Sequence, residues 1–277
     1  MSIEKPDSVD WNELADSFDA WLPYIQPVAE RLIDRLALHP GLRVLDVACG
    51  TGEPGLSIAR QCKGIELIGI DSARAMVEAS QRKVRREKLK GITHSLMRAE
   101  ALGFQDNTFD RVVSRFGVML FEDPLGGLRE MARVLRTGGR MVFSVWSSFE
   151  RVPAASIPFR LLVKQFPENE RPPEPRMASL GQTGKIEALL LDAGLPRYSI
   201  ERIDLIYVFD SPDELWRLAS QSGFARDLCA KLDEKQREAW HQDLLNSLIP
   251  FQKGGQTLLS NEARIVVIEK RSAASPG

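Results

Sequence analysis

The order of apolar and polar positions divides the chain into an N-terminal helical stretch, an alternating middle and a mixed C-terminal region. Residues 11–21 and 23–38 carry apolar side chains at helical spacing and predict two helices, which end at His39-Pro40-Gly41. In the middle, apolar runs typical of strands occur at residues 43–47, 66–70, 93–97, 111–114 and 140–146. Helix-like stretches lie between them at residues 54–62, 73–88 and 124–135. This alternation predicts a doubly wound, mostly parallel α/β sheet with its ligand crevice at the carboxyl ends of the strands.

The pattern changes after residue 147. A helix is expected at residues 154–166, a proline-rich stretch follows at 167–175, and another helix at 183–193 is ended by Gly194. Residues 198–209 and 256–270 are strand-like, with helical patterns at 212–248 between them. We therefore expect seven strands and five regions: an N-terminal helical cap (1–40), the cofactor-binding core (41–147), a lid insertion (148–182), the remainder of the sheet with a helical cover of the acceptor site (183–270) and a disordered tail (271–277).

Composition narrows the function classes. The chain has 277 residues, 43% of them apolar, and 37 basic against 38 acidic residues give a net charge of −1. A nucleic-acid partner is not expected without a basic excess, and the basic run at residues 82–88 lies on a predicted helix face. No apolar run approaches the roughly 18 to 20 residues of a membrane span. The polar, acidic start has no secretory pattern, so we expect a cytoplasmic protein.

The three cysteines predict neither a metal site nor a disulfide framework. Cys49, Cys62 and Cys229 have no metal-ligand spacing, and their odd number argues against a set of paired bridges. The sequence contains no other signal for a metal.

The segment from Asp46 to Gly55 combines the end of a strand, a glycine-rich turn and the start of a helix. Gly50-x-Gly52-x-x-Gly55 matches the dinucleotide fingerprint, and Asp71 lies at about the expected distance after it. A nicotinamide-dependent dehydrogenase is therefore one reading of the turn.

Charge argues against a dinucleotide. A pyrophosphate would lie at the N-terminus of the helix, where Glu53 and Asp46 are expected to be close. Two carboxylates near two phosphate charges cost free energy at low local dielectric. The same carboxylates suit a ligand without phosphate that carries cationic groups, as S-adenosylmethionine does with its ammonium and sulfonium.

Five segments carry motifs in a recognisable order: Val44 to Gly52, Ile68 to Asp71, Ala99 to Phe104, Phe109 to Gly117 and Val134 to Arg140. Together they resemble the class I S-adenosylmethionine-dependent methyltransferases, in particular the ubiquinone/menaquinone C-methyltransferase-like group. The resemblance covers about residues 11–146 and implies a Rossmann-like methyltransferase fold, with S-adenosylhomocysteine as the product of the donor.

The resemblance also implies which residues surround the donor. Asp71 would accept hydrogen bonds from both ribose hydroxyls; it is also a candidate N-cap for the helix at 73–88. The other implied donor-binding residues are Asp46, Ala48, Gly50, Gly52, Ser72, Met76, Ala99, Glu100, Ser114 and Arg115. Arg98 departs from the family, which usually has an acid there to read the adenine amino group. Either Arg98 points away from the adenine or the affinity is altered.

The sequence says less about the methyl acceptor than about the donor. Methyltransferases that act on adenine N6 or on glutamine side chains resemble one another in an Asn/Asp-Pro-Pro-Tyr/Phe motif at this place, and Ser114-Arg115-Phe116-Gly117 lacks it. The sequence also lacks the Pro-Cys nucleophile that methylation of cytosine requires. A small aromatic, quinol-like or natural-product acceptor remains, with O- or C-methylation slightly favoured over N-methylation of a small amine. His241 is the one histidine worth considering as a base. Candidates for the acceptor pocket are Trp21, Phe116, Trp146, Phe149 and Arg151.

Two other readings stay open beside the methyltransferase. One is the dehydrogenase, and the other is a protein that binds the donor only as a sensor or structural ligand. The sequence gives no information on oligomeric state.

Overall fold

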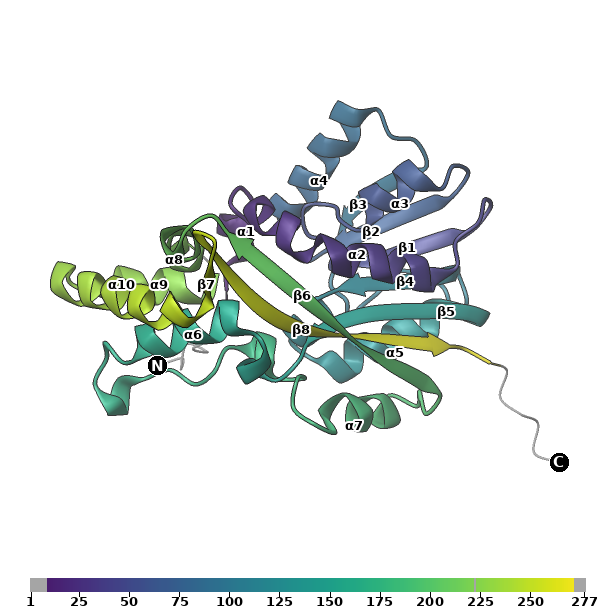
Figure 1. Ribbon diagram of the computed structural model, residues 1–277. Coiled ribbons are helices and arrows are strands. Elements are labelled where there is room, and N and C mark those ends of the chain that lie inside the picture. The colour runs from purple at the N-terminus through teal and green to yellow at the C-terminus, as the bar shows by residue number, and fades with distance from the viewer. Residues whose placement is uncertain (1–8, 222, 272–277) are drawn as a thin grey trace, which may run out of the picture.

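The computed structural model describes residues 9–221 and 223–271, so the predicted tail from Ser272 onward and the first eight residues lie outside the described part. Its centre is one sheet in which seven strands follow the order β3-β2-β1-β4-β5-β8-β6 (Figure 1). The strands are β1 (Arg43–Val47), β2 (Glu66–Asp71), β3 (Ile92–Leu96), β4 (Phe109–Arg115), β5 (Leu135–Trp146), β6 (Tyr198–Phe209) and β8 (Gln256–Glu269). An eighth strand, the two-residue β7 (Gln252–Lys253), pairs only with β8. This is the predicted doubly wound, mostly parallel α/β sheet.

β1 lies inside the sheet and pairs in parallel with β2 on one side and β4 on the other. β8 runs antiparallel to both of its neighbours, β5 and β6. From β1 the chain moves outward to β2 and β3, and then returns to β4 on the opposite side. The order therefore reverses next to β1, and a ligand crevice is expected at the carboxyl ends of the strands at such a reversal.

Right-handed crossovers explain the layers. The helices α3 (Gly55–Gln61) and α4 (Arg74–Glu87) belong to the outward path and pack on β2 and β3. The helix α5 (Pro124–Val134) belongs to the path in the other direction and packs on β5, with α7 (Lys185–Asp192) against it. Figure 1 shows α2 (Leu22–Leu36) crossing the sheet on the side opposite α5.

Several predicted boundaries move. The expected helix at residues 11–21 is two short pieces, α1 (Trp11–Leu14) and the 3-10 helix η1 (Phe18–Trp21). α2 ends at Leu36 because Ala37 takes a left-handed conformation, with φ at 49°. β5 begins at Leu135 rather than residue 140, since the chain leaves α5 directly into pairing with Phe109.

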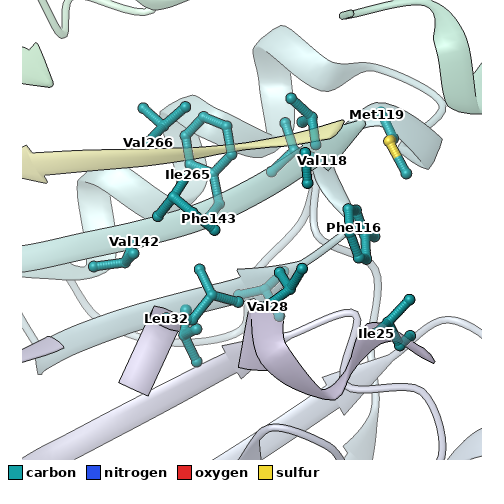
Figure 2. Packing of buried hydrophobic residues seen from close by; sticks show 14 of the residues in the cluster. Ile25, Val28, Leu32, Phe116, Val118, Met119, Val142, Phe143, Ile265 and Val266 are labelled. Atoms are coloured by element: carbon teal, nitrogen blue, oxygen red, sulfur yellow. The ribbon is translucent and has the colours of Figure 1, made fainter. Parts of the chain in front are cut away.

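The core fills both sides of the central strands. Val28 and Leu32 of α2 are fully buried, and Val142 and Phe143 of β5 belong to the same cluster. Figure 2 shows Val142 on the side of α2 and the Phe143 ring on the other side, as the alternation of a strand requires. Buried neighbours on both faces explain why these strands read as continuous apolar runs.

A helical cover lies at one end of the sheet. It consists of α6 (Pro153–Val163), α8 (Pro212–Gln221), α9 (Gly223–Ala230) and α10 (Glu234–Leu248). Three short 3-10 helices accompany them: Phe149–Arg151 precedes α6, Glu168–Glu170 lies within the proline-rich stretch, and Arg176–Ala178 follows it. α6 contacts α8, α9 and α10. Trp240 of α10 is completely buried and its indole donates to the Pro158 carbonyl at 3.0 Å. The cover is thus built jointly from the segments before and after residue 182. No helix in residues 9–221 and 223–271 is long and apolar enough to cross a bilayer.

Candidate active site

The glycine-rich turn leaves β1 in a tight, left-handed path. Ala48, Gly50 and Gly52 have φ values of 55°, 53° and 113°. A Cβ added to Gly52 would lie 2.7 Å from Leu56 Cδ1 and 3.2 Å from Ser80 Cβ, so this position has no space for a side chain. The turn therefore depends on glycine at residue 52 for both conformation and packing.

The backbone N–H groups of this turn are used within the protein. Gly50 N donates to Asp71 Oδ2 at 2.8 Å, Gly52 N to the Cys49 carbonyl at 2.9 Å, and Gly55 N to Asp46 Oδ2 at 3.0 Å. A dinucleotide site needs such N–H groups to face the pyrophosphate. Occupation of all three by internal acceptors argues against a dinucleotide more directly than charge does.

Asp71 connects the turn to the next helix. Its Oδ1 accepts a hydrogen bond from Ala73 N at 2.9 Å, in addition to the bond from Gly50. The N-cap of α4 is Ala73, so the alternative role of Asp71 as N-cap is wrong; the extended Ala73 (ψ 120°) delays the helix by two residues. Burial raises the pKa of Asp71 even though backbone N–H groups stabilise the carboxylate. Asp71 lines the site cavity described below, where its remaining lone pairs are available to a ligand.

Asp46 and Glu53 do not face a ligand as expected. Asp46 is completely buried, is not among the cavity-lining residues, and its pKa is raised to about 8, chiefly by burial. Glu53 Oε2 accepts a hydrogen bond from Ser57 N at 3.1 Å, and its Oε1 pairs with Arg60 at 2.7 Å. Both oxygens of this carboxylate therefore bind groups of α3. The expected pair of carboxylates beside the donor is therefore corrected. Both carboxylates instead accept hydrogen bonds from backbone N–H groups at the start of α3.

One large cavity of about 1510 Å³ joins the turn to the helical cover. At the turn its walls include Ala48, Gly50, Asp71, Ser72 and Met76, followed by Arg98, Ala99 and Glu100 after β3. Toward the other side of the sheet they include Arg115, Phe116, Trp146 and Tyr207. Trp11, Phe18 and Trp21 close it from the N-terminal segment, and Phe166, Pro167, Pro172, Pro173 and Pro175 close it from the proline-rich stretch.

The residues after β3 form a small charged group at one end of the cavity. Arg98 contacts Glu122 at 2.8 Å and Glu100 at 3.5 Å, and its side chain is half exposed. Glu100 Oε1 in turn accepts hydrogen bonds from the backbone N–H groups of Glu122 and Asp123. Arg98 thus lines the cavity, but its charge is balanced by two carboxylates.

The N-terminal segment is tied to the turn by polar contacts. Asp19 accepts a hydrogen bond from Thr51 Oγ1 at 2.6 Å and pairs with Lys83 at 2.7 Å. Asn12 Oδ1 accepts from Ala75 N at 3.0 Å. These contacts hold α1 and η1 over the turn and over α4.

An aromatic pair forms the opposite wall. The rings of Phe116 and Trp146 stack with centroids 4.1 Å apart and planes 15° apart, and both line the cavity. Phe116 has a positive φ of 57°, which is strained for a bulky residue, and its N–H donates to the Ser144 carbonyl and hydroxyl. The end of β4 therefore fixes an aromatic ring toward the cavity at a cost in backbone energy.

Six of the expected site residues lie outside the cavity wall. Besides Asp46, Gly52 packs on Leu56, and Ser114 is fully buried in β4. Phe149 packs in an edge-to-face contact on Phe159. Arg151 pairs with Glu262 at 3.1 Å, and His241 contacts Asp213 at 2.7 Å and the Trp216 ring at 4.4 Å. The positions of Phe149, Arg151 and His241 give them no contact with a ligand in this cavity.

Tyr207 is a wall residue that the sequence did not reveal. It is 2% exposed, its hydroxyl has no hydrogen-bond partner among the described residues, and its ring lies 5.0 Å from that of Tyr24. Alternation along β6 indicates that residues 205, 207 and 209 share a face. Only the placement of β6 at the end of the sheet, beneath α2, brings that face to the cavity.

The comparison with protein families matches the part of the chain that contains the glycine-rich turn. Residues 45–143 match the family described as a methyltransferase domain. The match begins in β1, ends in β5 and contains the turn, Asp71 and the aromatic Phe116. Residues 45–143 are therefore similar to this methyltransferase family.

Curated methyltransferases are similar to the same part of the chain. A ubiquinone/menaquinone biosynthesis C-methyltransferase of Geobacter sulfurreducens is 43% identical over 110 residues, which are 39% of this chain and 43% of that protein. A demethylmenaquinone methyltransferase of Bacteroides fragilis is 36% identical over 112 residues, 40% of this chain and 46% of the relative. The chain thus spans less than half the length of these relatives.

Solved structures share the fold beyond residues 45–143. The YcgJ protein of Bacillus subtilis has a TM-score of 0.61 at 19% identity and covers 90% of this chain and 100% of its own. A [4+2]-cyclase, SpnF, has a TM-score of 0.57 at 19% identity, with 91% of this chain and 83% of its own covered. Identity at this level shows the fold alone, and a cyclase with this fold means that chemistry has to be argued from the site.

Proposed function

We propose that the protein transfers the methyl group of S-adenosylmethionine to oxygen or carbon of a planar, largely apolar small molecule. The observation that carries this proposal is one cavity with a donor-type turn at one end and a stacked aromatic pair at the other. Its volume of about 1510 Å³ exceeds the roughly 300–1000 Å³ of a site for one small ligand. Donor and acceptor therefore have room in the same cavity.

On the donor side, Asp71 would accept from the ribose hydroxyls, since its carboxylate has lone pairs beyond the two that bind Gly50 and Ala73. Ala48, Gly50 and Ser72 would border the ribose and methionine portions. Met76, Ala99 and Glu100 would surround the adenine. The absence of free N–H groups at the three turn positions suits a ligand without phosphates and disfavours the dehydrogenase.

On the acceptor side, the Phe116 and Trp146 rings offer a flat apolar surface on which a planar molecule can stack. Trp21 and the proline-rich stretch would exclude water above it. Methyl transfer is an in-line displacement at the sulfonium methyl, for which alignment and exclusion of water supply most of the acceleration. The names of the relatives, which include quinone C-methyltransferases, support an aromatic acceptor of this kind.

Two measurements test the proposal. Calorimetry should detect binding of S-adenosylhomocysteine by the purified protein and no binding of a reduced nicotinamide dinucleotide. Labelled-methyl turnover against a panel of phenols, hydroquinones and small amines should then give methylated phenols or hydroquinones. Binding of the donor without turnover on any aromatic acceptor would indicate a protein that binds the donor only as a sensor or structural ligand. Tight binding of the nicotinamide dinucleotide would refute the proposal altogether.

A further inference from the structure

Two buried side chains in the acceptor half of the cavity each have one polar atom without a hydrogen-bond partner among the described residues. Arg115 at the end of β4 is 8% exposed, and its Nη1 has no hydrogen-bond partner among the described residues. Tyr207 of β6 is 2% exposed, and its hydroxyl is likewise unpaired. Both residues line the cavity. Leaving such groups unsatisfied costs free energy, and in a native site this points to a ligand that completes them.

The positive charge of Arg115 is poorly balanced by its surroundings. The acidic groups that act on it are Glu53, Asp46 and Asp19, together with the Tyr207 hydroxyl. Glu53 is already paired with Arg60, and Asp19 with Lys83. Burial raises the pKa of Asp46, which weakens that carboxyl as a counter-ion for Arg115. A buried cation whose acidic neighbours are paired elsewhere or weakly ionised is destabilising, and an anionic ligand would offset this cost.

The position of this pair favours the acceptor over the donor. Asp71 and Glu100 follow β2 and β3, whereas Arg115 and Tyr207 lie on β4 and β6, on the other side of β1. The residue after Arg115 is Phe116, whose ring belongs to the aromatic wall. Both side chains line the same cavity, and the positive charge of Arg115 acts to lower the pKa of the Tyr207 hydroxyl. Arg115, Tyr207 and Phe116 all line this cavity.

We propose that Arg115 and Tyr207 form an oxyanion site for the acceptor, which binds it as a phenolate or enolate. This inference rests on the proposed methyl transfer. The acceptor hydroxyl would release its proton to solvent as it binds, because the guanidinium stabilises the anion. The anion's oxygen, or its conjugated ring carbon, then donates an electron pair to the methyl carbon. The bond between methyl and sulfur breaks, and its electron pair stays on sulfur as the neutral thioether; a C-methylated ring afterwards loses its ring proton to solvent.

Such a site also explains how the reaction could proceed without a dedicated base. His241 lies outside the cavity wall, and no histidine of the described chain lines the cavity. A general base is needed only when the nucleophile must lose a proton in the transition state. An acceptor that is already anionic when bound removes that requirement.

The test uses 4-nitrophenol as the probe, because its phenolate has its own visible absorbance. In the presence of saturating S-adenosylhomocysteine, the pKa of the bound probe should lie at least about one unit below that of the free probe, a tenfold gain in phenolate at a given pH. Arg115→Met should abolish this change, and Tyr207→Phe should reduce it. Arg176→Met is the matched control, since Arg176 lines the cavity within the cover and should leave the pKa unchanged.

The outcomes separate this inference from the proposed function. If the wild-type protein fails to bind S-adenosylhomocysteine, the proposed function fails. If it binds but the probe does not bind, or binds without a change in pKa, the oxyanion site is overturned. A tenfold loss of S-adenosylhomocysteine affinity in Arg115→Met, with the bound probe unaffected, would assign Arg115 to the donor carboxylate and also overturn it. Should Arg115→Met not fold, the isosteric Tyr207→Phe decides the question by the same titration.

Discussion

Replacement of Asp71 by Asn separates two roles that the structure gives to one carboxylate. Asp71 accepts backbone hydrogen bonds from Gly50 at 2.8 Å and from Ala73 at 2.9 Å, one on each oxygen. The amide keeps one acceptor oxygen, and its NH₂ group would face an N–H donor on the other side. Asp71→Asn therefore loses one hydrogen bond to a charged group and leaves one N–H unsatisfied.

The loss can be estimated. A hydrogen bond to a charged group contributes roughly 1.5–3 kcal/mol. Burial raises the pKa of Asp71, which means that burial destabilises its charged form. Removal of the charge therefore offsets part of the lost hydrogen-bond energy. We expect a net decrease of about 1–2 kcal/mol in the free energy of unfolding, which corresponds to a Tm lower by roughly 2–8 °C in a protein of this size. Asp16→Asn is the control, because the Asp16 side chain is 98% exposed and its replacement should change stability by less than about 0.5 kcal/mol.

The ligand role is measured in the same melting experiment. S-Adenosylhomocysteine at one hundred times its Kd stabilises the wild-type protein by about 2.7 kcal/mol. If the ribose contacts are lost and affinity falls a hundredfold, the same concentration adds only about 0.4 kcal/mol. A folded Asp71→Asn variant with the full wild-type stabilisation would refute the ribose assignment. Unchanged stability without ligand would refute the structural role.

Three further predictions concern other parts of the site. Burial raises the pKa of Asp46 to about 8, above its unfolded value near 4, so its contribution to stability falls as pH rises through that window. Asp46→Asn cannot ionise, so its free energy of unfolding should rise relative to that of the wild type by up to about 1.4 kcal/mol per pH unit between about pH 5 and pH 7. Denaturant titrations check this, and parallel stability curves of the two proteins against pH would contradict it. Gly52→Ala should lower stability far more than Gly138→Ala, since both positions have positive φ but a Cβ at Gly138 meets no atom within 4 Å; equal losses on thermal melting would show that packing is not the cause. Trp146→Leu should raise the KM of an aromatic acceptor about threefold to tenfold and leave S-adenosylhomocysteine affinity within about twofold, which steady-state kinetics and calorimetry can check. A parallel loss of donor affinity would place Trp146 in the wrong half of the cavity.

The sequence predicted the fold because the relevant signals are local. The apolar runs of the buried parallel strands, the glycines at residues 50 and 52 and the alternation of strands with helices all depend on near neighbours in the chain. β1 and β6 have the predicted bounds, and the other strands differ mainly at their ends. The position of Asp71 at the end of β2 follows from the same patterns.

What the sequence could not decide is which way each polar side chain faces. Asp46 and Glu53 read as ligand carboxylates because they flank the turn, but the structure uses both to satisfy backbone N–H groups at the start of α3. Motif spacing gives the place of a residue on the chain, whereas burial and hydrogen bonding give the direction of its side chain.

The acceptor half belongs almost entirely to tertiary structure. Phe116, Trp146 and Tyr207 are separated by up to about ninety positions in the chain, and nothing in their local sequence relates them. They meet because parallel strands bring their carboxyl ends to one edge of the sheet, and because the antiparallel β8 places β6 beside that edge. The sequence by itself determined the sheet, the turn and the acid after β2. Only the three-dimensional packing determined that Arg115 and Tyr207, each with a polar atom that lacks a partner among the described residues, share the cavity wall with a stacked aromatic pair.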